Sequence, residues 1–241
     1  MKYILVTGAS GDIGKACANS LAKQGYSVYC HYNKNEAVAS ELVQQLRIDY
    51  PNQDFFTVQA DFNAIDTLDT LINQLFQLNG VVFAHGHTVY RLLTDTTNDD
   101  LTNLWNVHVH APIRICQLCQ SKLVAHKKSQ IVFISSVYGL IGSSMEVMYS
   151  TVKGAQIAFV KAYAKEVASM NLTVNAIAPG AVHTQMNDSW TTEEQAELLS
   201  AIPLNRMAQP KEIASLVNYL LSVDASYITG AAIPVTGGWT I

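Results

Sequence analysis

The chain has few charged residues and no concentration of positive charge. Only 14% of its 241 residues are charged, and the formal net charge is −4 at pH 7. No basic cluster exceeds the pair Lys127 and Lys128, so neither nucleic acid nor an anionic membrane is expected as the main partner. Hydrophobic residues make up 49% of the chain, which predicts an oligomer in which other subunits cover part of the surface.

The chain also lacks long apolar runs and a set of cysteines with the spacing of a metal site. No run approaches the roughly 20 residues of a membrane span, and the apolar stretch 3–6 is too short for a signal peptide. Cys116 and Cys119 form a Cys-x-x-Cys pair, but it lies in a helical run without a second pair of ligands. We therefore expect core thiols and no metal site. Together these absences predict a cytoplasmic protein.

Segments typical of strands and helices alternate along the whole chain. Short apolar runs predict strands at 3–7, 26–32, 55–60, 81–84, 131–135, 172–177 and 231–235. Helical spacing predicts helices at 15–24, 37–46, 67–78, 99–125 with an interruption near Pro112, 149–168 and 212–222. The pattern predicts an α/β fold: a single doubly wound Rossmann domain over 1–241, with a seven-stranded parallel sheet and helices on both faces. The polar segment 182–203 is expected to form a substrate lid.

A glycine-rich turn follows the first predicted strand and opens into a helix. In this context, glycines let backbone N–H groups and a helix N-terminus approach a pyrophosphate. A tight turn without a ligand is the alternative, but the strand before it and the helix after it favour a dinucleotide. The residues expected to cradle the pyrophosphate are Gly8, Ser10, Gly11, Asp12, Ile13 and Gly14.

The end of the second predicted strand indicates which dinucleotide binds. NAD sites usually place a carboxylate there, where it meets the ribose 2′-hydroxyl. Here the chain has no acid but offers Tyr32, Asn33 and Lys34. The lysine favours the extra phosphate of NADP(H), although an NAD-dependent alcohol dehydrogenase remains an alternative.

Tyr149 and Lys153 lie four residues apart in a segment with helical spacing, so their side chains share one face. A lysine in that position can lower the pKa of a tyrosine hydroxyl from its ordinary value of about 10. The hydroxyl could then exchange a proton with a substrate oxygen. Taken alone, the pair is a weak signal, because this spacing more often reflects a half-buried tyrosine beside a solvated lysine.

The order and spacing of several motifs resemble the short-chain dehydrogenase/reductase family over essentially the whole chain. The matching residues are Thr7-Gly8 with Gly14, Asp61, Ser136, Tyr149, Lys153, Pro179-Gly180, Tyr227-Ile-Thr-Gly230 and Gly237-Gly238. The resemblance implies that Tyr149 is the general acid of carbonyl reduction and that Ser136 binds the same oxygen. Lys153 would tune the tyrosine and hold the nicotinamide ribose.

The resemblance also implies the remaining cofactor contacts and the assembly. Asp61 would meet the adenine, with Phe62 and Gly86 as further contacts. The residues Pro179, Gly180, Val182 and Thr184 would border the nicotinamide. A homotetramer is expected, built partly through the predicted helices at 99–125 and 149–168.

Three positions depart from the family pattern. The usual Asn-Asn-Ala-Gly is replaced by Phe83-Ala84-His85-Gly86, and the catalytic asparagine aligns with His108. The histidine either holds the water of a proton relay or merely fills the space. Gly11 stands where NADP-using relatives often have an arginine, which leaves Lys34 as the candidate for the 2′-phosphate.

Within the family, the chain resembles bacterial 3-oxoacyl-acyl-carrier-protein reductases and, most closely, the elongation factor P 5-aminopentanone reductase branch. The narrower likeness rests on His31-Tyr32 and on the segments 92–97, 107–109 and 152–161. It implies a ketone tethered to elongation factor P, with a ketone on acyl carrier protein as the alternative. A catalytically lapsed NADP-binding sensor is an alternative of another class, motivated by the altered motifs.

Glu146 gives the narrower likeness a physical basis. It precedes Tyr149 by three residues, so it should lie at the rim of the substrate pocket and pair with the ammonium of an amine-bearing substrate. A solvated loop glutamate is the alternative. Four further acids in the expected lid fit the same kind of substrate: Asp188, Glu193, Glu194 and Glu197.

Overall fold

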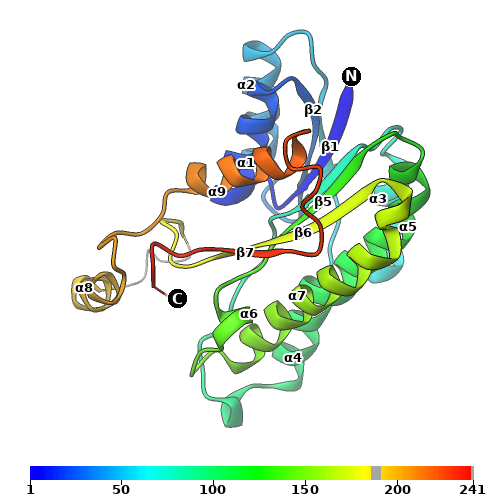
Figure 1. Ribbon diagram of the computed structural model, residues 1–241. Coiled ribbons are helices and arrows are strands. Elements are labelled where there is room, and N and C mark those ends of the chain that lie inside the picture. Colours follow the sequence, from blue (N-terminus) through cyan, green and yellow to red (C-terminus); the bar gives the residue numbers. More distant parts are fainter. Residues whose placement is uncertain (186–190, 240–241) are drawn as a thin grey trace.

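In the computed structural model, which describes residues 1–185 and 191–239, strands and helices alternate around one sheet (Figure 1). The strands are β1 Lys2–Thr7, β2 Tyr26–Tyr32, β3 Phe55–Gln59, β4 Gly80–Phe83, β5 Ser129–Ile134, β6 Leu172–Pro179 and β7 Ala232–Val235. They are all parallel, in the order β3-β2-β1-β4-β5-β6-β7. The order reverses between β1 and β4, as in a doubly wound Rossmann sheet. The predicted fold is confirmed.

Helices cover both faces of this sheet (Figure 1). One face carries α1 Asp12–Lys23, α2 Glu36–Asp49 and α9 Pro210–Leu221, and the other carries α3 Leu68–Asn73, α5 Ala111–Val124 and α7 Val147–Val167. The shorter helices are α4 Asn98–Trp105, α6 Tyr138–Ile141 and α8 Thr192–Ala201, and the non-α turns are η1 Ile65–Thr67, η2 Leu93–Asp95, η3 Asn106–His110 and η4 Ala168–Met170.

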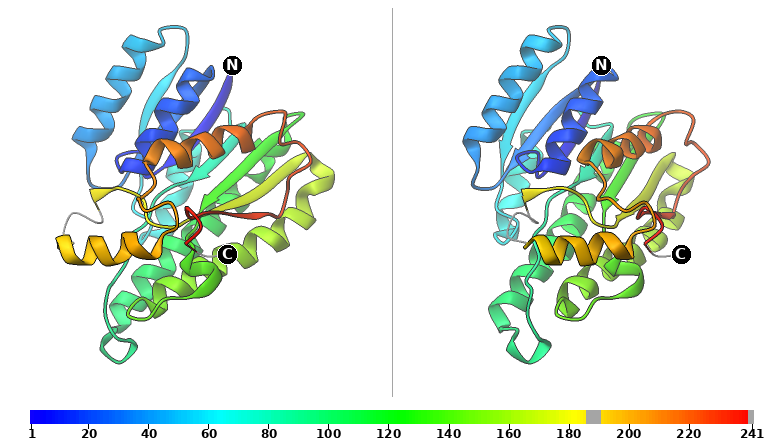
Figure 2. Two further views of the ribbon diagram at one scale, coloured as in Figure 1. Left: turned by 60° about the vertical axis from the view of Figure 1, so that its left-hand side comes forward. Right: turned by 90° about the vertical axis from the view of Figure 1, so that its left-hand side faces the viewer.

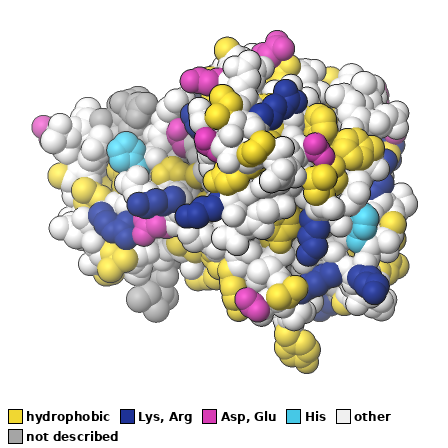
Figure 3. Space-filling model, turned by 90° about the horizontal axis from the view of Figure 1, so that it is seen from above, with side chains coloured by type: hydrophobic (Ala, Val, Ile, Leu, Met, Phe, Trp, Pro, Cys, Tyr) yellow, Lys and Arg dark blue, Asp and Glu magenta, His cyan; other side chains and the backbone are white. Residues whose placement is uncertain are grey.

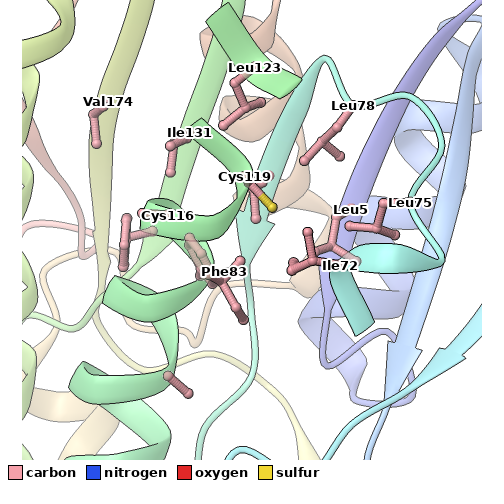
Figure 4. Packing of buried hydrophobic residues seen from close by; sticks show 14 of the residues in the cluster. Leu5, Ile72, Leu75, Leu78, Phe83, Cys116, Cys119, Leu123, Ile131 and Val174 are labelled. Carbon is pink, nitrogen blue, oxygen red and sulfur yellow. The ribbon is translucent and has the colours of Figure 1, made fainter. Parts of the chain in front are cut away.

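The Cys-x-x-Cys pair lies in the core and not in a metal site. Both thiols point from α5 toward the sheet, near Phe83 and Ile131 (Figure 4). Burial raises the pKa of Cys119 to about 12 and raises that of Cys116 as well, so both thiols stay protonated. Within the described residues, no group of three His, Cys, Asp or Glu could hold a metal ion.

One predicted helix is shorter in the structure, and another is interrupted where expected. The helix expected at 67–78 ends at Asn73, and the fully buried Leu75 and Leu78 instead fill the core as the chain turns into β4. The long helix expected at 99–125 is divided into α4, the π-turn η3 and α5, so the interruption lies just before Pro112. Proline has no N–H for the carbonyl four residues back, that of His108, and the Gln156 amide donates to this carbonyl instead.

The expected lid is partly a helix. Residues 186–190, and with them Asp188, lie outside the described residues, while α8 projects from the body of the fold (Figures 1 and 2). None of its residues is buried, and Thr191 and Glu194 form a reciprocal cap at its start. One of the expected lid acids therefore has a local structural role. Movement of this segment stays a prediction.

The helices and the surface side chains were compared with the expected absence of membrane spans and the expected subunit contacts. None of the described helices is long and apolar enough to cross a membrane. On the face shown in Figure 3, basic and acidic side chains are interspersed among apolar ones. Large exposed apolar side chains include Tyr90, Leu92, Leu93, Trp105, Leu140 and Ile141. They fit the expectation of subunit contacts, but the homotetramer stays a prediction.

Candidate active site

The predicted site residues gather at the carboxyl ends of six strands. In chain order they follow β1 (Gly8, Ser10, Gly11, Asp12, Ile13, Gly14), β2 (Tyr32, Asn33, Lys34), β3 (Asp61, Phe62), β4 (Gly86), β5 (Ser136) and β6 (Pro179, Gly180, Val182, Thr184), with Tyr32 and Pro179 as the last residues of β2 and β6. Parallel strands share one carboxyl edge, so these segments form one side of the molecule. Helix α7 brings Tyr149 and Lys153 to the same edge.

The glycine turn fits a dinucleotide pyrophosphate. Gly8 has φ +68°, and a Cβ at Gly14 would lie 2.1 Å from the carbonyl oxygen of Gly8. The turn therefore packs backbone against backbone and leads directly into α1, whose first N–H groups have no acceptor within the helix. The Asp12 carboxylate is already engaged, because it accepts a hydrogen bond from the Gln185 N–H at 2.8 Å.

The loops after β2 and β3 offer the expected features of an NADP ribose and adenine site. Lys34 and Asn33 are exposed, and the Asn33 amide donates to Asp61 at 3.5 Å. Asp61 also accepts the Asn63 N–H at 2.9 Å, which fixes its loop. Phe62 is buried and stacks on another ring. A cation is therefore available to a 2′-phosphate.

Tyr149, Lys153 and Ser136 meet between α7 and β5. The Lys153 ammonium lies 5.5 Å from the centre of the Tyr149 ring and donates to the carbonyl oxygen of Ile134 at 2.8 Å. The Ser135 hydroxyl donates to the carbonyl oxygen of Lys153 at 2.9 Å, which docks the helix on the strand. Ser136 is buried and hydrogen-bonds Tyr149 through its side chain.

Burial controls the ionisation of the pair. It raises the pKa of Tyr149 well above 10, although the hydrogen bond from Ser136 opposes this effect. It lowers the pKa of Lys153 to about 7. The lowered tyrosine pKa expected from Lys153 is therefore not found. Tyr149 is protonated at neutral pH, which is the state that a general acid needs.

His108 lies in the π-turn η3, edge-on to Tyr149 with ring centres 5.6 Å apart. Its Nε2 donates to the carbonyl oxygen of His87 at 2.8 Å, so Nδ1 is a hydrogen-bond acceptor. Nδ1 has no partner among the described residues. Burial lowers the pKa of His108 well below its ordinary value, so the ring is neutral at neutral pH. A Cβ at Gly86 would lie 2.5 Å from this ring, so the glycine makes room for it.

Glu146 is half-buried just before α7 and is not a solvated loop residue. The Thr88 hydroxyl donates to its carboxylate at 2.6 Å. Burial raises the pKa of Glu146 despite that hydrogen bond, and the charge of Glu146 acts on both Tyr138 and Tyr149. The carboxylate therefore lies close to Tyr149, and the hydrogen bond from Thr88 offsets only part of the cost of burying its charge.

Several residues near the site had no role assigned from the sequence. Thr88 holds Glu146, the Gln156 amide donates to the carbonyl oxygen of His108 at 2.7 Å, and His31 and His85 contact the glycine turn. Three of them, His31, His85 and Gln156, belong to segments already noted as departures from the family pattern or as likenesses to one of its branches, whereas Thr88 does not. Their partners lie 23 to 78 residues away in the chain, so no local pattern could reveal them.

Comparison with known proteins identifies the family. A family model described as enoyl-(acyl carrier protein) reductase matches residues 8–240. The chain is 40% identical to the uncharacterized oxidoreductase YmfI of Bacillus subtilis, over 99% of this chain and 98% of that protein. The chain belongs to the short-chain dehydrogenase/reductase family.

Two further relatives of this family are informative. The 3-oxoacyl-[acyl-carrier-protein] reductase FabG of Staphylococcus aureus is 32% identical, over 98% of this chain and 97% of FabG. The crystal structure of the angucycline C-6 ketoreductase LanV with bound NADP matches with a TM-score of 0.91 and 28% identity, over 99% of this chain and 95% of LanV. The prediction of a nicotinamide-dependent oxidoreductase is confirmed, and the LanV complex agrees with the predicted NADP.

Proposed function

We propose that this short-chain dehydrogenase/reductase uses NADPH to reduce a protein-tethered ketone that carries a free ammonium, as in 5-aminopentanone-modified elongation factor P. The observation that carries the proposal is the half-buried Glu146 carboxylate beside Tyr149, with Thr88 as its neutral hydrogen-bond donor at 2.6 Å. A ketone with a nearby ammonium would reach both groups at once.

The side chains around Tyr149 supply the proton half of the reaction. When bound, NADPH supplies the hydride. Tyr149 gives its phenolic proton to the carbonyl oxygen, so that carbonyl, hydride and proton together yield the alcohol. Ser136 donates a hydrogen bond to the same oxygen as negative charge develops on it. The Lys153 ammonium stabilises the phenolate that remains.

The cofactor is held by the strand-end segments. The N-terminus of α1 and the turn from Gly8 bind the pyrophosphate, and Lys34 pairs with the 2′-phosphate. Asp61 and Phe62 border the adenine, and the segment from Pro179 borders the nicotinamide. Lys34 is the residue that favours NADPH over NADH.

His108 completes the proton path. Its unpartnered Nδ1 faces a buried region in which the Lys153 charge acts on it. A neutral imidazole there accepts a hydrogen bond from a water, and this water returns a proton toward Lys153 and Tyr149. His108→Asn restores the residue type usual in the family, so it should keep most of the activity.

Glu146 selects the substrate through charge. A partly buried carboxylate with a raised pKa lacks a full counter-charge. A substrate ammonium supplies this charge in a site with little water, where a charge-assisted hydrogen bond is strong. A neutral acyl chain gains nothing from the carboxylate.

The test compares a 5-aminopentanone-lysine peptide with its N-acetylated form, in which the ammonium is replaced by a neutral acetamide, and NADPH oxidation is the readout. Glu146→Gln should lower kcat/KM for the amine at least about tenfold and leave the acetylated ketone unchanged. The control is Glu166→Gln, which changes an exposed glutamate in the last turn of α7. An equal effect of Glu146→Gln on both ketones would refute the ammonium site without touching the reductase assignment.

Reduction of 3-oxoacyl groups on acyl carrier protein is the second candidate, favoured by the 32% identity to FabG of S. aureus. Acetoacetyl-acyl carrier protein belongs in the same assay. Turnover of this thioester in preference to both amine-bearing and acetylated ketones would support the second candidate. NADPH binding without turnover of any ketone would support a sensor that has lost its chemistry.

A further inference from the structure

Two buried imidazole rings flank the end of the central strand β1. The sheet order places β1 between β2 and β4, and the glycine turn begins where β1 ends. His31 comes from the neighbouring end of β2, and His85 follows β4. The two histidines therefore lie on opposite sides of Thr7 and Gly8, at the point where the strand order reverses.

His31 holds the turn from the β2 side. Its Nε2 lies 3.1 Å from the carbonyl oxygen of Ala60, and a carbonyl only accepts, so Nε2 carries the proton. The bare Nδ1 then accepts the N–H of Gly8 at 3.1 Å. The main chain of the same residue adds a second bond, since its carbonyl accepts the N–H of Ala9 at 2.8 Å.

His85 holds the turn from the β4 side. Its Nε2 lies 2.8 Å from the carbonyl oxygen of Val107, which fixes the proton on Nε2. Its Nδ1 therefore accepts the hydroxyl of Thr7 at 2.6 Å. The backbone of the two segments also touches, because a Cβ on Gly8 would lie 2.7 Å from the Cα of His85.

Phe62 connects the two rings. It stacks on His31 with ring centres 4.4 Å apart and an angle of 9°, and it meets His85 edge-on at 4.5 Å. Although His85 is partly accessible as a residue, Phe62 and Phe83 enclose its ring. His31, Phe62 and His85 thus form one packed group. The two histidines hold the turn expected at the pyrophosphate, and they also fix Phe62, which is expected at the adenine.

We propose that His31 and His85 are positioning residues of the dinucleotide site, which hold the Thr7–Gly8 turn as neutral rings with the proton on Nε2. The Gly8 N–H is engaged by His31 and does not face a phosphate. The pyrophosphate is therefore left to the Ser10 N–H of the turn and to the first N–H groups of α1. Loss of the Nδ1 acceptor frees the turn to rotate and weakens the cofactor site while the sheet itself persists.

The test uses two amides that each replace one ring nitrogen of His31. Asparagine places an oxygen near the position of Nδ1, whereas glutamine reaches the position of Nε2. We expect His31→Gln to raise the NADPH dissociation constant about tenfold, since it leaves the partly buried Gly8 N–H without its acceptor. His31→Asn should stay within about threefold of the wild type. The exposed His110→Gln is the matched control.

Binding is measured by NADPH fluorescence, and melting temperature is measured without cofactor. Equal dissociation constants for the two His31 variants, with only melting temperatures lowered, would reduce His31 to a structural residue and overturn the proposal. Thr7→Val removes the hydroxyl that bonds His85 and should also weaken NADPH binding.

Nitrogen-15 NMR of histidine side chains in the wild type needs no variant. It should show the rings of His31 and His85, together with that of His108, with a bare Nδ1 and a protonated Nε2 at neutral pH. Protonated Nδ1 atoms on both His31 and His85 would likewise overturn the proposal.

Discussion

Lys153→Met should change how the stability of the protein depends on pH. Burial lowers the pKa of Lys153 from 10.5 to about 7 in the folded chain. Between these values the unfolded chain keeps a proton that the folded chain has released, so the free energy of unfolding of the wild type rises with pH. The methionine variant lacks this gain.

The size of the effect follows from the two pKa values. Each pKa unit corresponds to about 1.4 kcal/mol, so the buried lysine costs about 4 kcal/mol at pH 7 and about 2 kcal/mol at pH 9. The substitution also leaves the Ile134 carbonyl without its donor, which costs about 1 to 3 kcal/mol at either pH. The change in relative stability between pH 7 and pH 9 therefore reports the lysine pKa alone, because the cost of the lost hydrogen bond cancels.

Urea denaturation at one protein concentration measures this difference. The free energy of unfolding of Lys153→Met, relative to the wild type, should fall by about 2 kcal/mol from pH 7 to pH 9. Lys161→Met, an exposed lysine on the same helix, should show no such fall. A relative stability of Lys153→Met that is constant over this range would refute the argument that burial sets the Lys153 pKa.

Three further predictions concern the cofactor site and the acid. Lys34→Ala should raise the dissociation constant of NADPH roughly tenfold and leave that of NADH unchanged, as measured by fluorescence titration. Gly14→Ala should abolish NADPH binding and lower the melting temperature by several degrees, because its Cβ would lie 2.1 Å from the Gly8 carbonyl oxygen. Gly11→Ala, whose Cβ has only a 3.4 Å contact, should melt close to the wild type. Ser136→Ala should lower kcat about a hundredfold or more in the ketone assay.

The fold could be predicted from the sequence because its signals are local. Apolar runs, helical spacing and the glycine turn after Thr7 each depend on neighbouring residues, and parallel connectivity follows from their alternation. The convergence of Gly8, Ser136 and Pro179 then follows from the shared carboxyl edge of the strands. The shared face of Tyr149 and Lys153 followed from the spacing of one helical turn, and their role followed from the order of the family motifs around them.

What the sequence did not reveal depends on contacts across the fold. Leu75 and Leu78 continue a helical spacing, yet they pack into the core after the helix has ended. The sequence predicts an interruption near Pro112, but it does not indicate that the interruption is a π-turn that carries His108. The raised pKa of Tyr149 reflects how deeply α7 packs on β5, and the half-buried state of Glu146 depends on Thr88, 58 residues away. The pKa of Tyr149 and the burial of Glu146 can therefore be found only once the packed structure is known.

Single-turnover reduction tests the central claim, that Tyr149 protonates a ketone as NADPH is oxidised. The protein is loaded with NADPH, mixed with the amine-bearing ketone, and followed by the loss of NADPH absorbance. Tyr149→Phe should bind NADPH like the wild type and reduce the ketone about a hundred to ten thousand times more slowly. The fully exposed Tyr227→Phe should change nothing. Reduction by Tyr149→Phe at the wild-type rate would contradict the account.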